Sequence, residues 1–287
     1  MKLNHHLNVL CNRNREGSYA TQGNRKTSLL RCAKDLKSIG YNQVNSLHSL
    51  KPKHIDVLVK HWQEKNLSEG TIKNRMANLR WVAEKINRPD LIAKDNAFYG
   101  IENRSFVGVN KALDFTQQAL NTINDRNVQA SAMLQKAFGL RREEAMKICP
   151  SKADAGDQLK LDRSWCKGGR AREIEIRTDY QRQALDHAKS IAGNSSLIPA
   201  NLSYVKHLGV WEKQMQSVGL GRTHGARHAF AQDRYKSITG WLPPAQGGPK
   251  YKDMNNADKA IDRSARLQVS RELGHERLQI TATYLGS

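Results

Sequence analysis

Residues 273–287 read LGHERLQITATYLGS, and this stretch decides how the rest of the chain is interpreted. Tyr284 follows His275 by nine residues, near the C-terminal end of a strongly basic sequence. Two upstream segments carry further polar side chains, THGARH at 223–228 and GLRREE at 139–144. Together they supply a phenol, guanidinium groups and imidazoles. Such a set suits attack on a phosphodiester by a tyrosine, with cations stabilising the charge that develops.

The charge of the chain favours a polyanionic partner. Its 287 residues include 47 Lys and Arg against 27 Asp and Glu, a formal net charge of +20. Residues 1–104 contribute +10 and the remainder contributes +10, so the excess is not confined to a tail. This field favours nucleic acid. Ribosome association, an anionic membrane and general solubility are the alternatives.

Cysteine usage and hydropathy indicate the compartment. The four cysteines form no CxxC pair and have no zinc spacing, so we expect reduced thiols. No apolar run approaches the roughly 18–20 residues that cross a bilayer. Residues 1–6 lack the hydrophobic core of a signal peptide. We therefore expect a soluble cytoplasmic protein without membrane contact.

The first third of the chain is predicted to be a small helical domain over 21–104, after an N-terminal extension over 1–20 without clear periodicity. Apolar residues recur at helical spacing over 24–39, after Pro52 and after Ser68, which is a good N-cap. The outer face of the third helix is interpreted as a DNA-facing surface, with a solvated face as the alternative. Its candidate DNA contacts are Lys73, Arg75 and Arg80.

A linker over 105–112 separates this domain from a second one over 113–287, because the sequence around it has no sustained periodicity. The second domain is expected to be largely helical. Two alternating stretches, 158–162 and 172–176, flank a Lys-Gly-Gly-Arg turn and predict a β-hairpin. The Pro- and Gly-rich stretch 240–249 predicts a surface loop. The fold class is therefore mainly α with a small β-hairpin.

The motifs are similar to those of the tyrosine recombinases, the site-specific integrase family that includes the Xer proteins and lambda-type phage integrases. They occur in the family's order over about residues 20–287. The matching residues are Arg141 and Glu144 after Gly-Leu, Lys167 before a strand, His224 and Arg227 in a His-x-x-Arg box, and His275 and Tyr284 in the last box. The resemblance implies a helical, SAM-like core-binding domain followed by a mixed α/β catalytic domain.

The resemblance also implies a role for each matched residue. Tyr284 would form a 3′-phosphotyrosyl link, while Arg141 and Arg227 clamp the phosphate. Lys167 would protonate the leaving 5′-oxygen, His224 would assist proton transfer, His275 would bond a phosphate oxygen, and Glu144 would buttress the site. Neither metal, ATP nor another cofactor is expected. The implied partners are double-stranded DNA in the nucleoid, a homotetramer joining two sites, and accessory directionality or DNA-bending factors.

Several alternatives stay open at this point. A catalytically retired architectural or regulatory DNA-binding protein would keep the fold, and a type IB topoisomerase or telomere resolvase would share the chemistry. Arg142 could replace Arg141 as phosphate ligand, and His224 with His228 could bind a metal, although no third ligand is evident. Arg170 and Arg172, near Lys167, are further candidate DNA contacts.

Two departures from the family pattern concern the end of the chain. Only three residues follow Tyr284 in this sequence, which leaves open how protomers couple. Arg227 and His275 are 48 residues apart, a long step that includes the Pro- and Gly-rich stretch. That stretch is either inert or a contact for DNA or a partner.

Overall fold

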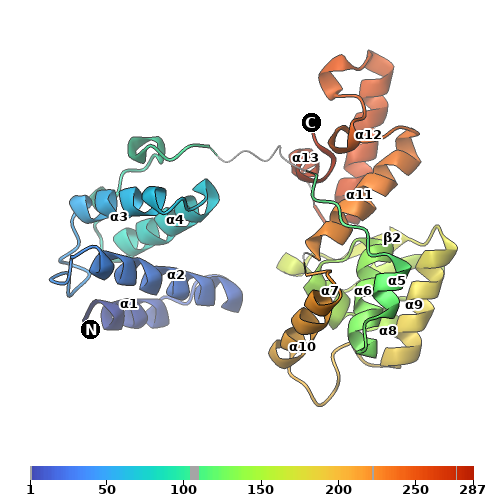
Figure 1. Cartoon of the computed structure of the whole chain (residues 1–287), viewed down its shortest axis with the longest axis horizontal. Helices are drawn as coiled ribbons and strands as arrows, with labels where there is room; N and C mark the ends of the chain where they lie inside the picture. The colour runs from blue at the N-terminus through green and yellow to red at the C-terminus, as the bar shows by residue number, and fades with distance from the viewer. Residues whose placement is uncertain (1, 104–109, 222, 276) are drawn as a thin grey trace. The chain divides into compact units, whose positions relative to one another are not determined.

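The computed structural model describes residues 2–103, 110–221, 223–275 and 277–287. The chain divides into two compact units, Met1–Ser105 and Phe106–Ser287, drawn in blue to green and green to red in Figure 1. Most of the linker expected at 105–112 falls on residues 104–109, which lie outside the described residues.

The first unit is helical throughout its described residues. Its elements are α1 (Lys2–Arg13), α2 (Tyr19–Ser38), α3 (Pro52–Glu64) and α4 (Glu69–Lys85), followed by the 3-10 turns η1 (Pro89–Leu91) and η2 (Ala97–Tyr99). Local sequence sets the helix starts as predicted, because Pro52 occupies the first turn of α3 and the Ser68 hydroxyl accepts a hydrogen bond from the Thr71 N–H. Ser18 caps α2 in the same way, so this helix begins earlier than residue 24.

Two segments without clear periodicity belong to the helical core. Residues 1–20 were predicted to lack regular structure, but α1 buries Leu3 and Leu7 in the same cluster as Leu29 and Leu36 of α2. The sequence after α4 lacks periodicity, yet it buries apolar side chains against the helices, namely Leu91, Ile92 and Ile101. The first unit thus includes both flanks of the predicted helices.

The second unit is mainly α with one small sheet, as the sequence predicted. Its elements up to the sheet are α5 (Gln117–Asn121), α6 (Arg126–Phe138), α7 (Arg142–Lys147), α8 (Pro150–Ala153), β1 (Gln158–Leu161), the 3-10 turn η3 (Lys167–Gly169) and β2 (Arg172–Glu175). After the sheet come α9 (Asp179–Ala192), α10 (Tyr204–Ser217), α11 (His224–Thr239), η4 (Pro244–Gln246), η5 (Tyr251–Asp253), α12 (Asn256–Glu272), η6 (Leu278–Thr281) and α13 (Ala282–Leu285).

The sheet is the predicted hairpin, with a longer connection than a two-residue turn. β1 and β2 pair antiparallel, with Leu159 opposite Ile174 and Leu161 opposite Arg172. Successive side chains of a strand face opposite sides, so Arg172 shares the buried face with Ile174 while Glu173 and Glu175 are exposed. Because of this alternation, the side chain of Arg172 is buried.

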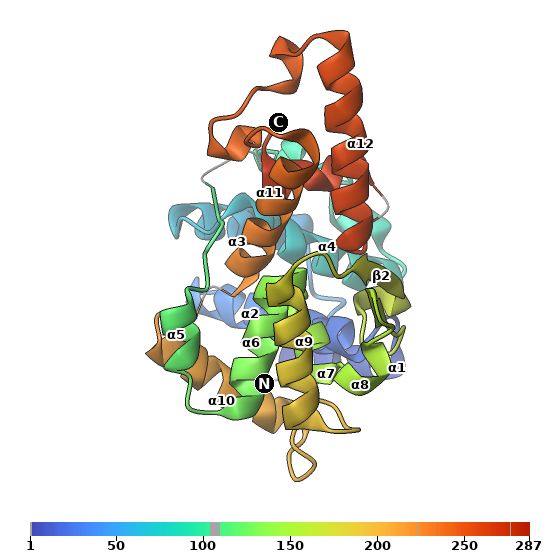
Figure 2. The same ribbon diagram turned by 90° about the vertical axis from the view of Figure 1, so that its right-hand side faces the viewer.

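The C-terminal helices pack around α11. Figure 2 shows α11 alongside α12, and α13 also packs on α11. Their shared core includes Phe230, Tyr235, Val269 and Leu285. The irregular segment between α11 and α12 ends at residue 255, because Asn255 caps α12. It contains η4 and η5, and residues 256–262 are helical.

Candidate active site

Arg227 lies at the centre of the candidate site. It sits in the first turn of α11 and is completely buried. Its Nη1 donates to the Gly139 carbonyl at 2.6 Å, its Nη2 donates to the Leu273 carbonyl, and its Nε lies 3.3 Å from the Tyr284 hydroxyl. Burial lowers the pKa of Arg227 to about 10, which leaves the guanidinium charged at neutral pH.

Gly139 makes this close approach possible. It ends α6 with φ +59°, a left-handed conformation that favours glycine. A Cβ at this position would lie 2.5 Å from Cδ1 of Phe230 on α11. The small residue therefore lets the end of α6 reach α11 and present its carbonyl to Arg227.

Glu144 fixes a second arginine. Its carboxylate accepts from the Arg141 backbone N–H at 2.8 Å and from Arg141 Nη1 at 2.6 Å, because it is the third residue of a helix that Arg141 caps. Arg172 Nη2 donates to the same carboxylate at 2.6 Å. These two guanidinium groups outweigh the effect of burial and hold the pKa of Glu144 at about 2. Glu144 is therefore ionised, and it orients Arg141 from behind.

His275 links both arginines to the tyrosine. Its Nε2 lies 3.4 Å from Arg141 Nη2, from Arg227 Nη2 and from the Tyr284 hydroxyl. A guanidinium can only donate, so Nε2 is the acceptor and the ring proton belongs on Nδ1. Partial burial and the nearby arginines lower the pKa of His275 to about 4. The imidazole is thus neutral at physiological pH.

Tyr284 is held against two more imidazoles. It lies on the short helix α13 and is 5% exposed. Its ring centroid lies 4.7 Å from that of His228 and 6.0 Å from that of His224. Burial and neighbouring cations lower the pKa of His228 to about 4, and they lower that of His224 as well. Tyr284 therefore has neutral imidazoles and the charged Arg227 as neighbours.

Lys167 lies on η3, in the connection between the two strands, and it is exposed. Its charge is among those that lower the pKa of His224. Gly168 and Gly169 follow it with left-handed backbones at φ +75° and +67°. Glycine is what such a turn requires, so the Gly-Gly pair presents Lys167 at the edge of the site.

The predicted DNA-contacting cations divide into two groups. Lys73 bonds the Asn103 side chain at an exposed position, and Arg170 is exposed. Arg80 is partly buried and bonds the Ala93 carbonyl and the Asn96 side chain. Arg75 and Arg172 are buried, so their prediction as DNA contacts on the surface is wrong.

Arg75 and Arg172 are buried because of the faces on which they lie. Arg75 shares the inner face of α4 with Ile72 and Met76, and it pairs with Asp35 at 2.8 Å. Arg172 is on the inner face of β2, where its Nε also donates to the Glu272 carbonyl at 2.9 Å. The helical periodicity of α4 and the strand alternation of β2 place these two arginines on inner faces, so their burial could have been predicted from the sequence.

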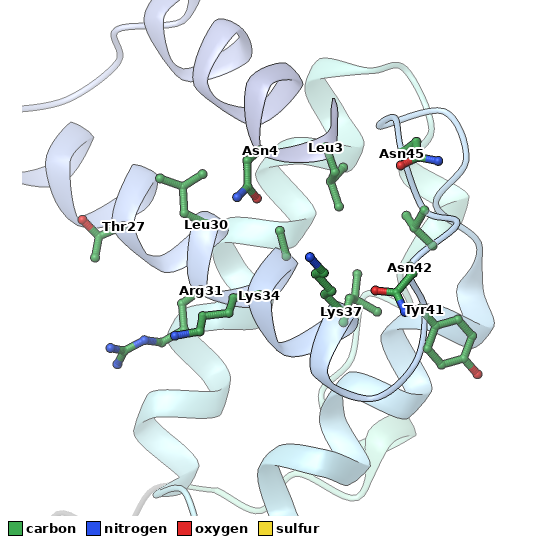
Figure 3. Close-up of a pocket in the computed structure, with 13 residues that line it drawn as sticks. Leu3, Asn4, Thr27, Leu30, Arg31, Lys34, Lys37, Tyr41, Asn42 and Asn45 are labelled. Atoms are coloured by element: carbon green, nitrogen blue, oxygen red, sulfur yellow. The ribbon is translucent and has the colours of Figure 1, made fainter. Parts of the chain in front are cut away.

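Helix α2 carries three exposed cations that were not predicted from the sequence as DNA contacts. They border a hollow of about 830 Å³ between α1, α2 and the loop after α2 (Figure 3). Within the described part of the chain none of these three cations pairs with a carboxylate; they are Arg31, Lys34 and Lys37. His228 was also not predicted as a neighbour of Tyr284, because the sequence pointed to His228 only as a metal partner of His224.

No three His, Cys, Asp or Glu side chains among the described residues come together as a metal-binding cluster. None of the described helices is long and apolar enough to span a membrane. All four cysteines are free thiols.

The geometry suits the binding of a tetrahedral anion beside a phenol. Arg227 Nε and His275 Nε2 lie 3.3 and 3.4 Å from the Tyr284 oxygen, and Arg141 Nη2 lies 3.4 Å from the same His275 nitrogen. Planar guanidinium groups bond two oxygens of a phosphate at once and stay charged. A phosphate that took over these donors would sit next to the Tyr284 oxygen.

Family comparisons cover most of the chain. A family model described as "Phage integrase, N-terminal" matches residues 1–92, and one described as "Integrase" matches residues 101–233. None of the curated protein sequences matches the chain.

Solved structures share the fold at low identity. A lambda integrase dimer bound to a COC′ core site has a TM-score of 0.66 at 14% identity, covering 99% of this chain and 77% of that chain. The XerH site-specific recombinase bound to a palindromic difH substrate has a TM-score of 0.62 at 15% identity, with 98% and 80% covered. The Tn1549 transposon integrase in complex with transposon right end DNA has a TM-score of 0.54 at 14% identity, with 99% and 94% covered.

Proposed function

Because the chain belongs to the phage integrase family of tyrosine recombinases, we propose that it is a site-specific DNA recombinase. It cleaves and rejoins DNA through a 3′-phosphotyrosyl intermediate and integrates or excises a mobile element or prophage. The observation that carries this proposal is that Arg227 and His275 both contact the Tyr284 oxygen, while Arg141 contacts the same His275 nitrogen.

In the first chemical step the scissile phosphate takes the place that His275 Nε2 now holds between the two guanidinium groups. The Tyr284 oxygen attacks phosphorus, the bond to the 5′-oxygen breaks, and one phosphodiester replaces another. No energy source is needed because the number of ester bonds does not change. Arg141 and Arg227 stabilise the charge on the non-bridging oxygens, an interaction whose loss costs about 10²–10³ in rate per donor.

Proton transfer is assigned to the groups around this centre. Lys167 donates a proton to the leaving 5′-oxygen, which explains its place on an exposed turn at the edge of the site. The neutral His224 assists in taking the phenol proton. Once the phosphate accepts from the arginines, His275 can carry its proton on Nε2 and donate to a phosphate oxygen. Glu144 and Arg172 keep Arg141 in place and do not touch DNA.

The DNA duplex is held by both units, each with a net charge of +10 over residues 1–104 and 105–287. We assign residues 21–104, extended by α1, to core-site binding and 113–287 to catalysis. Lys73, Arg170 and the α2 cations are the proposed phosphate contacts. Strand exchange joins two sites in a homotetramer, with accessory directionality or DNA-bending factors as further partners. The protein acts in the cytoplasm, associated with the nucleoid. Lambda integrase on its core site and XerH on difH were solved bound to DNA, which supports this assignment.

The proposal is tested with DNA from the junctions that flank the gene, nicked near the crossover so that religation is blocked. The protein is mixed with this DNA in excess EDTA, and adducts are resolved by denaturing electrophoresis. We expect an adduct with the wild type and none with Tyr284→Phe, which still binds the DNA. Tight binding by the wild type without an adduct on any junction would instead support the catalytically retired architectural protein.

A further inference from the structure

The Pro- and Gly-rich segment between α11 and α12 lies against the chain just after Tyr284. Gly286 follows α13 with φ +78°, and a Cβ there would lie 2.7 Å from the Ala245 backbone N and 3.2 Å from Pro244. Ala245 and Pro244 belong to η4, and α13 packs on η4. The long insertion between Arg227 and His275 is therefore in contact with the helix that carries the candidate nucleophile.

A network of polar side chains also holds Gly286. Arg266 of α12 donates from Nη1 to the Gly286 carbonyl at 2.9 Å, and its Nε donates to the Asp262 carboxylate at 2.9 Å. Asp262 also accepts from the Tyr235 hydroxyl at 2.5 Å, and that hydroxyl accepts from Trp241 Nε1 at 3.0 Å. Trp241 lies near the start of the Pro- and Gly-rich segment, so the network joins α11, α12 and this segment to Gly286, the residue that follows α13.

A third contact reaches the tyrosine itself. Gln232 of α11 is completely buried, and its Nε2 donates to the Tyr284 backbone carbonyl at 2.9 Å. The helix α13 has only four residues. One helical turn is not stable by itself in water, so its conformation depends on such tertiary contacts.

We propose that residues 241–248 and Arg266 form a clamp that positions Tyr284 within the catalytic unit that carries it. Arg266 and Gly286 are positioning residues, since they act through the backbone around Tyr284. The clamp predicts cleavage in cis, in which one protomer supplies both the arginines and the tyrosine. This inference rests on the proposed recombinase function, and it gives the insertion a role in that function.

The main test compares Gly286→Ala with Gly219→Ala. Both glycines have a positive φ, +74° at Gly219 and +78° at Gly286, but a Cβ at Gly219 meets nothing within 4 Å, whereas one at Gly286 meets η4. We expect Gly286→Ala to slow adduct formation on the nicked DNA by about 10²-fold, the cost of displacing a reacting group by about 1 Å. DNA affinity and Tm should match those of Gly219→Ala, which should cleave at the wild-type rate.

A second measurement does not depend on activity. The Gly286 N–H donates to the Ala282 carbonyl at 3.0 Å, so hydrogen exchange of residues 282–286 reports whether α13 is held. We expect exchange there to be at least about 10-fold faster in Gly286→Ala than in Gly219→Ala, since the turn cannot persist without its contacts. Unchanged exchange would overturn the clamp whether or not the wild type cleaves DNA.

The cis arrangement is tested by mixing two inactive proteins, Tyr284→Phe and Arg141→Ala. A clamp that keeps the nucleophile in its own unit predicts no adduct from the mixture. An adduct would show that Tyr284 serves a neighbouring protomer, and it would refute the inference while leaving the recombinase function intact. A wild type that forms no adduct would instead refute the function.

Discussion

Glu144 connects the buried interior to the reactive surface. One carboxylate accepts from Arg172, which is buried, and from Arg141, whose side chain is 19% exposed. A buried carboxylate is stable only when its charge is compensated, and here two guanidinium groups do so. The motif residues at 141 and 144 were readable from the sequence. Arg172 was predicted to contact DNA, although strand alternation places it on the same buried face as Ile174.

Replacing Arg172 tests this arrangement. Arg172→Ala leaves the Glu144 charge with one partner, so we expect a loss of about 3–5 kcal/mol in the free energy of unfolding of the catalytic unit. This corresponds to a Tm lower by about 10 °C for a unit of this size. Adduct formation should also slow, and Arg172→Lys should recover part of both. Arg163→Ala, at an exposed position of the same connection, serves as the control. Equal Tm values for the two alanine variants would contradict the buried role.

The buried histidines make stability depend on pH. His275 and His228 have pKa values of about 4 in the folded protein against an ordinary value of 6.5. Between pH 6.5 and pH 4 the unfolded chain therefore binds protons that the folded chain excludes, so stability falls as the pH falls.

Thermal unfolding at pH 7.0, 5.5 and 4.5 checks this dependence. We expect the wild-type Tm to drop across this series and the drop to be smaller in His275→Gln, which removes one of the two groups. A Tm that rises toward pH 4.5, or an equal drop in the variant, would count against neutral imidazoles around Tyr284.

Among the elements, α3 and α4 were predictable because each begins with a strong local signal, Pro52 and Ser68. α1 was missed although Leu3, Leu7 and Leu10 have helical spacing, since polar Asn and His residues dilute the pattern. Its burial depends on the face of α2, which is a tertiary contact. The position of the Pro- and Gly-rich segment could not be predicted for the same reason: its sequence forbids a long helix but does not say which surface it covers.

Leu7→Ala measures how far α1 stabilises the first unit. Leu7 is 5% exposed, so we expect the substitution to cost about 2 kcal/mol, at the low end for a buried leucine because α1 is terminal. Hydrogen exchange of the buried α3 amides in the full chain should then accelerate by about 30-fold. Asn12→Ala, exposed on the same helix, should leave that exchange unchanged. If both variants exchange alike, α1 is not part of the cooperative core.

Across the whole molecule the charge of +20 predicts that salt weakens DNA binding. Each phosphate that a cation neutralises contributes about −0.9 to the slope of log affinity against log salt concentration. The motifs, in their order along the chain, also predicted two units and a set of residues that the structure brings together beside Tyr284. Which cations are exposed was predicted less well, because one sequence cannot tell a cation on an open surface from one that bonds its own chain.

Lys34 and Lys37 on α2 are the clearest test of that surface. The double variant Lys34→Gln with Lys37→Gln should reduce the magnitude of the salt slope by about 2 and weaken binding alike on every DNA sequence. A control with the same change of charge, Lys65→Gln with Lys94→Gln, alters exposed lysines of the first unit away from the hollow. Identical slopes for the two variants would remove α2 from the DNA interface.

The central claim is that the Tyr284 oxygen becomes bonded to a DNA phosphate. The direct measurement is mass spectrometry of the adduct formed in EDTA, after digestion with nuclease and with trypsin. Cleavage after Arg277 gives a peptide over 278–287 in which Tyr284 is the one tyrosine. We predict that this peptide carries a nucleotide joined through its 3′-phosphate to Tyr284. A nucleotide on any other residue would contradict the account.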